Sequence, residues 1–103
     1  MTKEIKFKNW NCKLVKNKYR NGRTALELVA AEDDEENEIF EGEPIANCTV
    51  NIHDIELNAD EVCIKNYSEN ERMLETLVNA GIVKPTGINV ETGFVSIPIC
   101  KLL

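Results

Sequence analysis

The sequence predicts one α+β domain, in which a single helix of about residues 69–80 packs on an antiparallel, twisted sheet of five to six strands. Three observations lead to this fold class: one segment with a helical start, stripe and stop, several stretches of alternating apolar and polar residues, and a strong hairpin signal at Asn21-Gly22. The 103 residues, 43% of them hydrophobic and 29% charged, can bury a core that needs no disulfide or metal. We therefore expect residues 1–103 to form a single small domain.

The predicted helix begins with a capping box and ends at a glycine. Ser68 and Glu71 have the S-x-x-E spacing in which each side chain accepts a backbone N–H of the other residue. Gly81 can adopt the left-handed conformation that ends many helices. Between them lies one apolar stripe, formed by Met73, Leu74, Leu77 and Val78. Because a single stripe must be buried and the rest of the chain has mostly strand patterns, we expect this helix to lie on a sheet.

The N-terminal third predicts a bend followed by a hairpin. Apolar residues change from odd to even positions after Phe7, which predicts a bend or bulge near Lys8 and Asn9. Asn21-Gly22 is typical of a two-residue type I′ turn, in which both central residues have positive φ. The resulting register places Lys16 opposite Glu27, Val15 opposite Leu28 and Leu14 opposite Val29.

Three more strands are predicted in the remainder of the chain. The alternation over residues 46–52 and 62–67 predicts a second hairpin, and the tail at 94–103 predicts a last strand. Pro98 has no N–H to donate, so this last strand is expected at the sheet edge or with one side unpaired at that point. Its apolar residues, which could pair with another chain and make a homodimer, are Ile97, Ile99, Leu102 and Leu103.

Charge is unevenly distributed along the chain, although the net charge is −6. Residues 1–24 hold eight Lys and Arg side chains and one acidic one, whereas the other residues hold four basic and seventeen acidic side chains. Residues 32–43 are the most acidic stretch, and we expect a mobile surface loop or a lengthened hairpin tip there. Phosphate mimicry or cation chelation would be functional alternatives, but the stretch lacks the order of a calcium-binding loop.

The basic residues suggest a nucleic-acid surface on the first hairpin. Phosphate-attracting charge alternates there with the rings of Trp10 and Tyr19, which could stack on bases. The acidic character of the whole protein argues against a polyanionic partner, and a protein partner would suit the uneven charge equally well. The predicted basic patch comprises Lys13, Lys16, Lys18, Arg20 and Arg23, within residues 13–23.

The four cysteines are predicted to be packing residues. No two of them have the close spacing of zinc ligands, and each falls within a strand pattern. The first ten residues hold no apolar run typical of a signal peptide or membrane span, so we expect reduced thiols in a cytoplasm and no membrane contact. His53 is the only histidine, and no catalytic motif accompanies it. We predict no catalytic residue, metal or cofactor; a small cysteine-dependent enzyme or metal protein is the least favoured alternative.

The residues around the helix start suggest a contact surface. Ser68 and Glu71 are explained by the capping box, but four neighbours have no structural explanation in the sequence. We therefore predict a candidate interaction surface formed by Lys65, Asn66, Tyr67 and Asn70.

The same segment, residues 64–71 followed by Met73-Leu74 and residues 77–83, resembles a family of proteins of about one hundred residues and unknown function. The hairpin residues Tyr19, Asn21-Gly22 and Ala25-Leu26 and the strand at 49–51 are similar too, so the resemblance spans nearly the whole chain. This family occurs in gut bacteria and their phages and conjugative elements. The resemblance implies a bacterial cytoplasm and an accessory role in a mobile element, and it supplies no activity for any residue. Together with the charge pattern, it leads us to expect a non-catalytic interaction or modulator protein with an unknown protein partner; nucleic-acid binding is the alternative.

Overall fold

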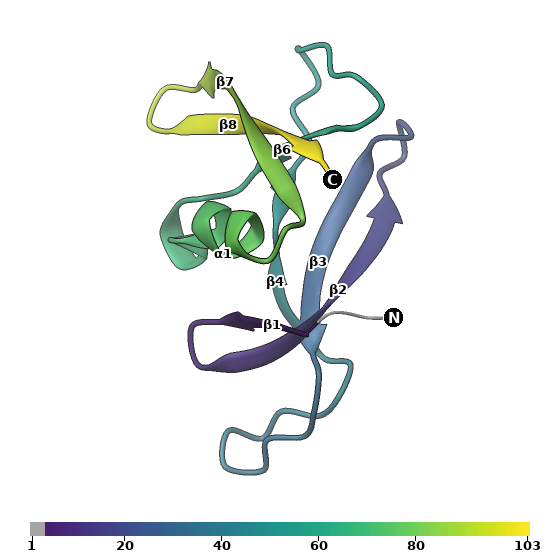
Figure 1. Ribbon diagram of the computed structural model, residues 1–103, viewed down its shortest axis with the longest axis vertical. Coiled ribbons are helices and arrows are strands. Elements are labelled where there is room, and N and C mark those ends of the chain that lie inside the picture. The colour runs from purple at the N-terminus through teal and green to yellow at the C-terminus, as the bar shows by residue number, and fades with distance from the viewer. Residues whose placement is uncertain (1–3) are drawn as a thin grey trace.

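Two antiparallel sheets and one helix make up residues 4–103, which are the residues that the computed structural model of the protein describes (Figure 1). The first sheet has the order β1-β2-β3-β4, with β1 at Glu4–Phe7, β2 at Trp10–Lys18, β3 at Thr24–Ala30 and β4 at Pro44–Asn47. The second has the order β5-β6-β8-β7, with β5 at Thr49–Val50, β6 at Glu61–Ile64, β7 at Val83–Glu91 and β8 at Ser96–Leu102. A 3-10 turn at Ser68–Asn70 precedes α1 at Met73–Asn79. The predicted α+β class is confirmed.

The prediction of a single sheet of five to six strands is wrong, and Cys48 shows why. Its N–H donates to the Leu26 carbonyl of β3 at 2.9 Å, and its carbonyl accepts the Lys65 N–H at 2.8 Å. The strand predicted over 46–52 therefore breaks at this residue. Its first part pairs with β3 in one sheet and its second part with β6 in the other.

The two N-terminal turns are present, but each differs in detail from the prediction. The bend at Lys8 and Asn9 is a complete reversal of the chain, with Phe7 opposite Trp10. The hairpin near Gly22 is confirmed, and its predicted register is wrong by one residue, since Leu14 lies opposite Leu28 and Lys16 opposite Leu26. Among the residues of this turn only Gly22 has positive φ, at 88°. A two-residue type I′ turn needs two such residues, so the connection takes in a third residue instead.

The last strand lies inside its sheet, so its prediction as an edge strand is wrong. β8 pairs with β7 on one side and with β6 on the other. Pro98 faces Asn89 of β7, whereas β6 pairs only with the stretch from Ile99 to Lys101. The alternative, one unpaired side at Pro98, is confirmed. The apolar residues expected to pair with another chain are thus not on a free edge, and Ile97 and Ile99 are buried.

Two groups of buried residues stabilise the fold. The primary core lies where both sheets meet α1, and the secondary core lies on the other face of the second sheet. Neighbouring residues of β6 point to different cores, since Val62 and Ile64 belong to the primary core and Cys63 to the secondary one. The primary core consists of Ile5, Phe7, Cys12, Leu26, Leu28, Cys48, Val62, Ile64, Met73, Leu77, Val83 and Cys100. The secondary core consists of Cys63, Ile97 and Ile99, partly covered by Val50, Ile52, Ile55, Leu57, Tyr67, Val90 and Val95.

Helix α1 ends as predicted but begins four residues later. Gly81 has φ 74°, its N–H donates to the Val78 carbonyl, and the next N–H donates to the Leu77 carbonyl, which is a Schellman ending. At the start, Ser68 has φ 55° and its side chain caps nothing, so the predicted capping box is wrong. The Oδ1 atom of Asn66 instead accepts the Leu74 N–H at 2.8 Å. An amide from the preceding connection therefore satisfies one of the free N–H groups of the helix start.

Candidate functional site

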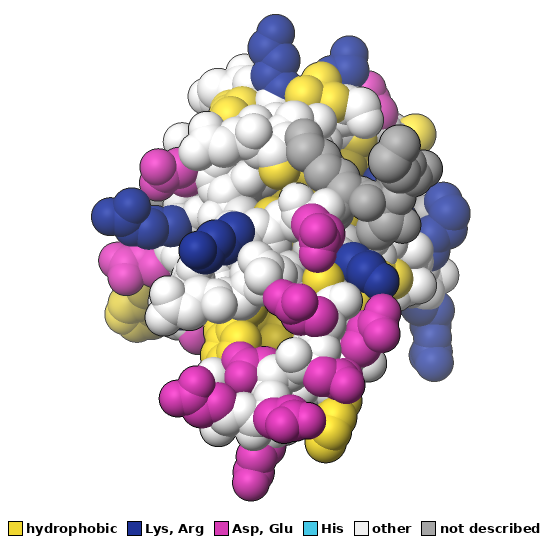
Figure 2. Space-filling view, turned by 60° about the horizontal axis from the view of Figure 1, so that its bottom comes forward, with side chains coloured by type: hydrophobic (Ala, Val, Ile, Leu, Met, Phe, Trp, Pro, Cys, Tyr) yellow, Lys and Arg dark blue, Asp and Glu magenta, His cyan; other side chains and the backbone are white. Residues whose placement is uncertain are grey.

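The acidic tip, residues 32–43, connects β3 to β4 and projects from the end of the first sheet (Figure 1). Asp34 and Ile39 exchange two backbone hydrogen bonds, of 2.7 and 2.9 Å. The Asp34 carboxylate also accepts the Asn37 amide, and the Asp33 carboxylate accepts the Glu41 N–H at 2.9 Å. The lengthened hairpin tip, one of the two predicted alternatives, is confirmed. Figure 2 shows the Asp and Glu side chains gathered over this end of the molecule.

A cavity of about 230 Å³ lies at the base of the acidic tip. The half-buried Trp10 forms part of its wall, and the Asn11 amide on the same strand donates to Glu32 at 2.7 Å. Acidic and apolar side chains therefore lie together at this base. The other acidic and apolar residues of the wall are Ala30, Asp33, Asp34, Glu35, Ile39 and Ile45.

The structure does not bring the predicted basic patch together. Lys13 forms an ion pair with Glu41 of the acidic tip at 3.0 Å. The Arg23 guanidinium donates to the carbonyls of Ile52 and Ile55, so it holds the loop of residues 51–60 against the hairpin. The remaining three basic residues are exposed near the hairpin turn, where Lys16 and Lys18 lie on the opposite face of β2 from Lys13. The third of these residues is Arg20.

The two rings that accompanied the basic patch also have structural contacts. Trp10 packs against the primary core. The Tyr19 hydroxyl lies 2.7 Å from the Thr49 hydroxyl, which connects the first hairpin to the second sheet. Both rings are half-buried and are held by these contacts.

The surface predicted around the helix start is occupied largely by internal contacts. Asn66 caps α1, and Asn70 is 1% exposed and donates to the Asn47 carbonyl. Lys65 forms an ion pair with Glu69 and lies 5.7 Å from the centre of the Tyr67 ring. The hydrogen bond between these two charged groups raises the pKa of Lys65 and lowers that of Glu69. Of the four residues, Lys65, Asn66 and Tyr67 keep partial exposure. Because Asn66 caps the helix, Lys65 and Tyr67 are the two that could still contact a partner.

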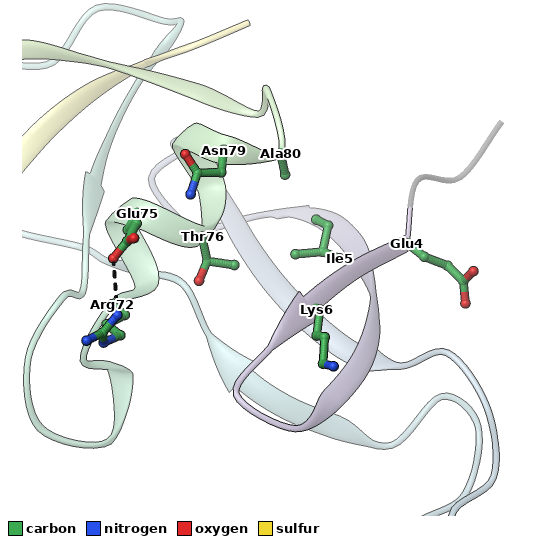
Figure 3. Close-up of a pocket in the computed structure, with 8 residues that line it drawn as sticks. All are labelled: Glu4, Ile5, Lys6, Arg72, Glu75, Thr76, Asn79 and Ala80. Carbon is green, nitrogen blue, oxygen red and sulfur yellow. Dashed lines mark ion pairs between the residues drawn. The ribbon is translucent and has the colours of Figure 1, made fainter.

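A groove between β1 and α1 is a feature that the sequence did not suggest (Figure 3). Its cavity volume is about 420 Å³. In Figure 3 Ile5 points toward α1, whereas Glu4 and Lys6 point away from the helix. The helix side is polar, and Arg72 forms an ion pair with Glu75 at 3.7 Å. The remaining lining residues are Thr76, Asn79 and Ala80. The groove was missed because residues about seventy positions apart form it.

The cysteines are in environments that disfavour the reactive thiolate. Burial, together with the nearby Cys12 and Glu27, raises the pKa of the Cys48 thiol to about 12. Burial and the neighbouring Cys63 raise that of Cys100 to about 11. Burial also raises the pKa values of Cys12 and Cys63. Thiols of this kind are poor nucleophiles near neutral pH.

His53 is exposed in the loop of residues 51–60. Within residues 4–103 no three His, Cys, Asp or Glu side chains come together in a way that could bind a metal ion. The same part of the chain has no helix of sufficient length and apolar character to span a bilayer. Comparisons of the chain with protein-family models, with curated proteins and with solved structures found no match.

Proposed function

We propose that this protein is a non-catalytic interaction module that binds a protein with a basic surface, as an accessory or modulator protein of a bacterial mobile element. The observation that carries the proposal is the gathering of carboxylates at the acidic tip, at the other end of β3 from three exposed basic side chains. The acidic tip follows the end of β3, while the exposed Lys16, Lys18 and Arg20 lie around the hairpin that precedes it. Seven residues of β3 at about 3.3 Å each separate the two ends by about 23 Å.

The acidic tip supports a protein partner better than the basic end supports a nucleic acid. Its backbone and carboxylate hydrogen bonds hold residues 33–41 in one arrangement, so little conformational entropy remains to be lost on binding. Phe40 is 59% exposed among these carboxylates and offers an apolar anchor of the kind that contributes most of the energy at interfaces. The carboxylates would speed association with a basic surface and fix its orientation. The basic end, by contrast, has lost Lys13 and Arg23 to internal contacts.

The proposal is tested with two variants of equal net charge. Glu35→Lys/Glu36→Lys changes exposed side chains of the acidic tip that make no side-chain hydrogen bond among the described contacts. The matched control, Asp54→Lys/Glu56→Lys, places the same charge change in the loop of residues 51–60. A partner captured from bacterial lysate by the unchanged protein is purified, and its affinity for all three proteins is measured by calorimetry.

We expect the tip variant to lose about tenfold or more in affinity, a change worth about 1.4 kcal/mol, and the control to stay close to the unchanged protein. Equal weakening by both variants would show a non-specific charge effect and overturn the proposal. Nuclease-sensitive capture, with binding lost in Lys16→Ala/Lys18→Ala/Arg20→Ala and kept in the tip variant, would favour the nucleic-acid alternative.

A further inference from the structure

The outer edge of β1 carries backbone groups that point away from its neighbour. Phe7 and Trp10 face each other across a two-residue turn, so this pair exchanges both backbone hydrogen bonds. Bonded and non-bonded pairs alternate in antiparallel sheets, and Ile5 is therefore bonded to Cys12. The N–H and C=O groups of Glu4 and Lys6 point to the free edge. No backbone hydrogen bond within residues 4–103 reaches these groups from outside the ladder.

The groove in Figure 3 borders this edge. Three residues of β1 line the groove. Glu4 and Lys6 are those whose backbone groups point to the free edge, and Ile5 lies between them. The side chains from α1 are polar or charged apart from Ala80. A strand added here would therefore meet polar surroundings and gain most from backbone hydrogen bonds and matched charges.

The other outer strands of the two sheets have features that hinder the addition of a strand. β7 has Pro85 as its third residue and shifts its register between Pro85 and Asn89. Proline and irregular pairing are means by which proteins protect sheet edges. β4 begins with Pro44, and the carbonyl of Asn47 accepts the Asn70 amide. β5 has only two residues. β1 has neither a proline nor a bulge.

The sequence of β1 is complementary to itself in one antiparallel register. Two copies can exchange hydrogen bonds only where the outward-pointing residues Glu4 and Lys6 face each other. Glu4 opposite Glu4, or Lys6 opposite Lys6, would place like charges side by side, which is unfavourable. Glu4 opposite Lys6 forms two favourable pairs related by a two-fold axis at Ile5. Side chains directly opposite in this way lie about 5 Å apart at Cβ.

We propose that a second copy of this chain binds at the free edge of β1, with Glu4 of each copy opposite Lys6 of the other, to give one continuous eight-stranded sheet. The contact is isologous, so it closes as a dimer and does not grow into a filament. Only a short stretch pairs, and the dimer is accordingly a weak, reversible one at the small end of interface sizes. The inference is independent of any partner at the acidic tip.

Variants that reverse the charges of Glu4 and Lys6 test this dimer. Sedimentation equilibrium is measured from about 1 µM to about 1 mM, the range in which a small interface dissociates. Glu4→Lys and Lys6→Glu each create two like-charge pairs, and we expect each to weaken the dimer about tenfold or more. The double variant Glu4→Lys/Lys6→Glu restores both opposite-charge pairs, and its dimerisation should return close to that of the unchanged protein. Lys84→Glu, on the outer strand of the second sheet, is the matched control for Lys6→Glu and should leave the dimer intact.

Glu4 also faces Lys13 within the sheet, so Glu4→Lys could destabilise the protomer itself. A second measurement on the unchanged protein therefore tests the dimer without any substitution. Amide exchange at Glu4 and Lys6 should slow as protein concentration rises, while exchange in β7 should not change. The proposal is overturned if the unchanged protein remains monomeric throughout the concentration range. It is equally overturned if the double variant stays as weak as the single ones, or if Lys84→Glu weakens the dimer as much as Lys6→Glu.

Discussion

The primary and secondary cores lie on opposite faces of the second sheet and are closed in different ways. Twelve buried side chains from both sheets and α1 form the primary core, whereas three form the secondary core. On the secondary side, the loop of residues 51–60 supplies three of the seven covering side chains, Ile52, Ile55 and Leu57. The same strands therefore have one face covered by regular structure and the other covered in part by a loop.

The covers of the two cores are also fastened differently. α1 is held at its start by Asn66 and at its end by the Schellman bonds around Gly81. The loop of residues 51–60 is held by the Arg23 guanidinium, which donates to the carbonyls of Ile52 and Ile55. Loops with few fixed contacts open locally at lower free energy than the global unfolding of a domain. The difference teaches that the fold depends on the primary core, and that the secondary core can be perturbed without loss of the domain.

The largest expected effect comes from a cavity in each core. Leu77→Ala in α1 should lower the free energy of unfolding by about 3–4 kcal/mol, because Leu77 is fully buried between regular elements that cannot collapse onto the space. Ile99→Ala in the secondary core should cost about 2 kcal/mol, because Ile99 is 7% exposed and the loop over it can adjust. Urea unfolding measures both values. An equal or greater cost for Ile99→Ala would contradict the ranking of the two cores.

The loss of stability at alkaline pH tests the burial of the Cys48 thiol in the primary core. The pKa of Cys48 is raised from 9.0 to about 12 by burial, so the folded protein keeps this proton while the unfolded chain loses it. The contribution to stability is complete below pH 9 and is lost as pH rises from 9 toward about 12. At pH about 10.5 the loss is about 2 kcal/mol.

The effect of Cys48 is isolated by comparison with Cys48→Ala. Other groups titrate in the same range, but they remain in the variant. The fall in the free energy of unfolding between pH 8 and about 10.5 should therefore be about 2 kcal/mol smaller in Cys48→Ala than in the unchanged protein. Parallel pH profiles for the two proteins would contradict burial of an uncharged thiol at this position.

The parts of the fold that were predicted correctly depend on local chemistry. Gly81 ends the helix because a residue with positive φ is required there, and the hairpin forms around Gly22 for the same reason. The division into two sheets depends on Cys48, whose backbone bonds reach residues 22 positions before it and 17 after it. No local pattern in the sequence carries that information. The hairpin register likewise depended on the φ angle of Asn21, which the Asn-Gly signal alone does not determine.

The site residues show the same limit more strongly. Five basic residues close in sequence looked like one patch, but Lys13 and Arg23 have partners from residues 41, 52 and 55. Strand alternation separates Lys16 and Lys18 from Lys13. The groove beside β1 forms because α1 packs next to this strand. The apolar stripe of the helix predicts that it is buried on a sheet but does not say beside which strand. The opposite charges of Glu4 and Lys6 were visible in the sequence, but they became informative only once β1 was known to lie at an open edge.

The smallest expected effect comes from the residue that caps the start of α1, the helix that covers the primary core. Asn66→Ala removes the acceptor of the Leu74 N–H and should lower the free energy of unfolding by about 1 kcal/mol, the usual cost of a lost helix cap. Ser68→Ala is the matched control, because the exposed Ser68 side chain makes no capping bond and its loss should change stability by less than about 0.5 kcal/mol. The sequence-based capping box predicts the reverse order, with Ser68→Ala the costly change. Chemical denaturation of the two variants therefore decides whether Ser68 or Asn66 caps α1. A larger loss of unfolding free energy for Ser68→Ala would mean that α1 begins at the capping box.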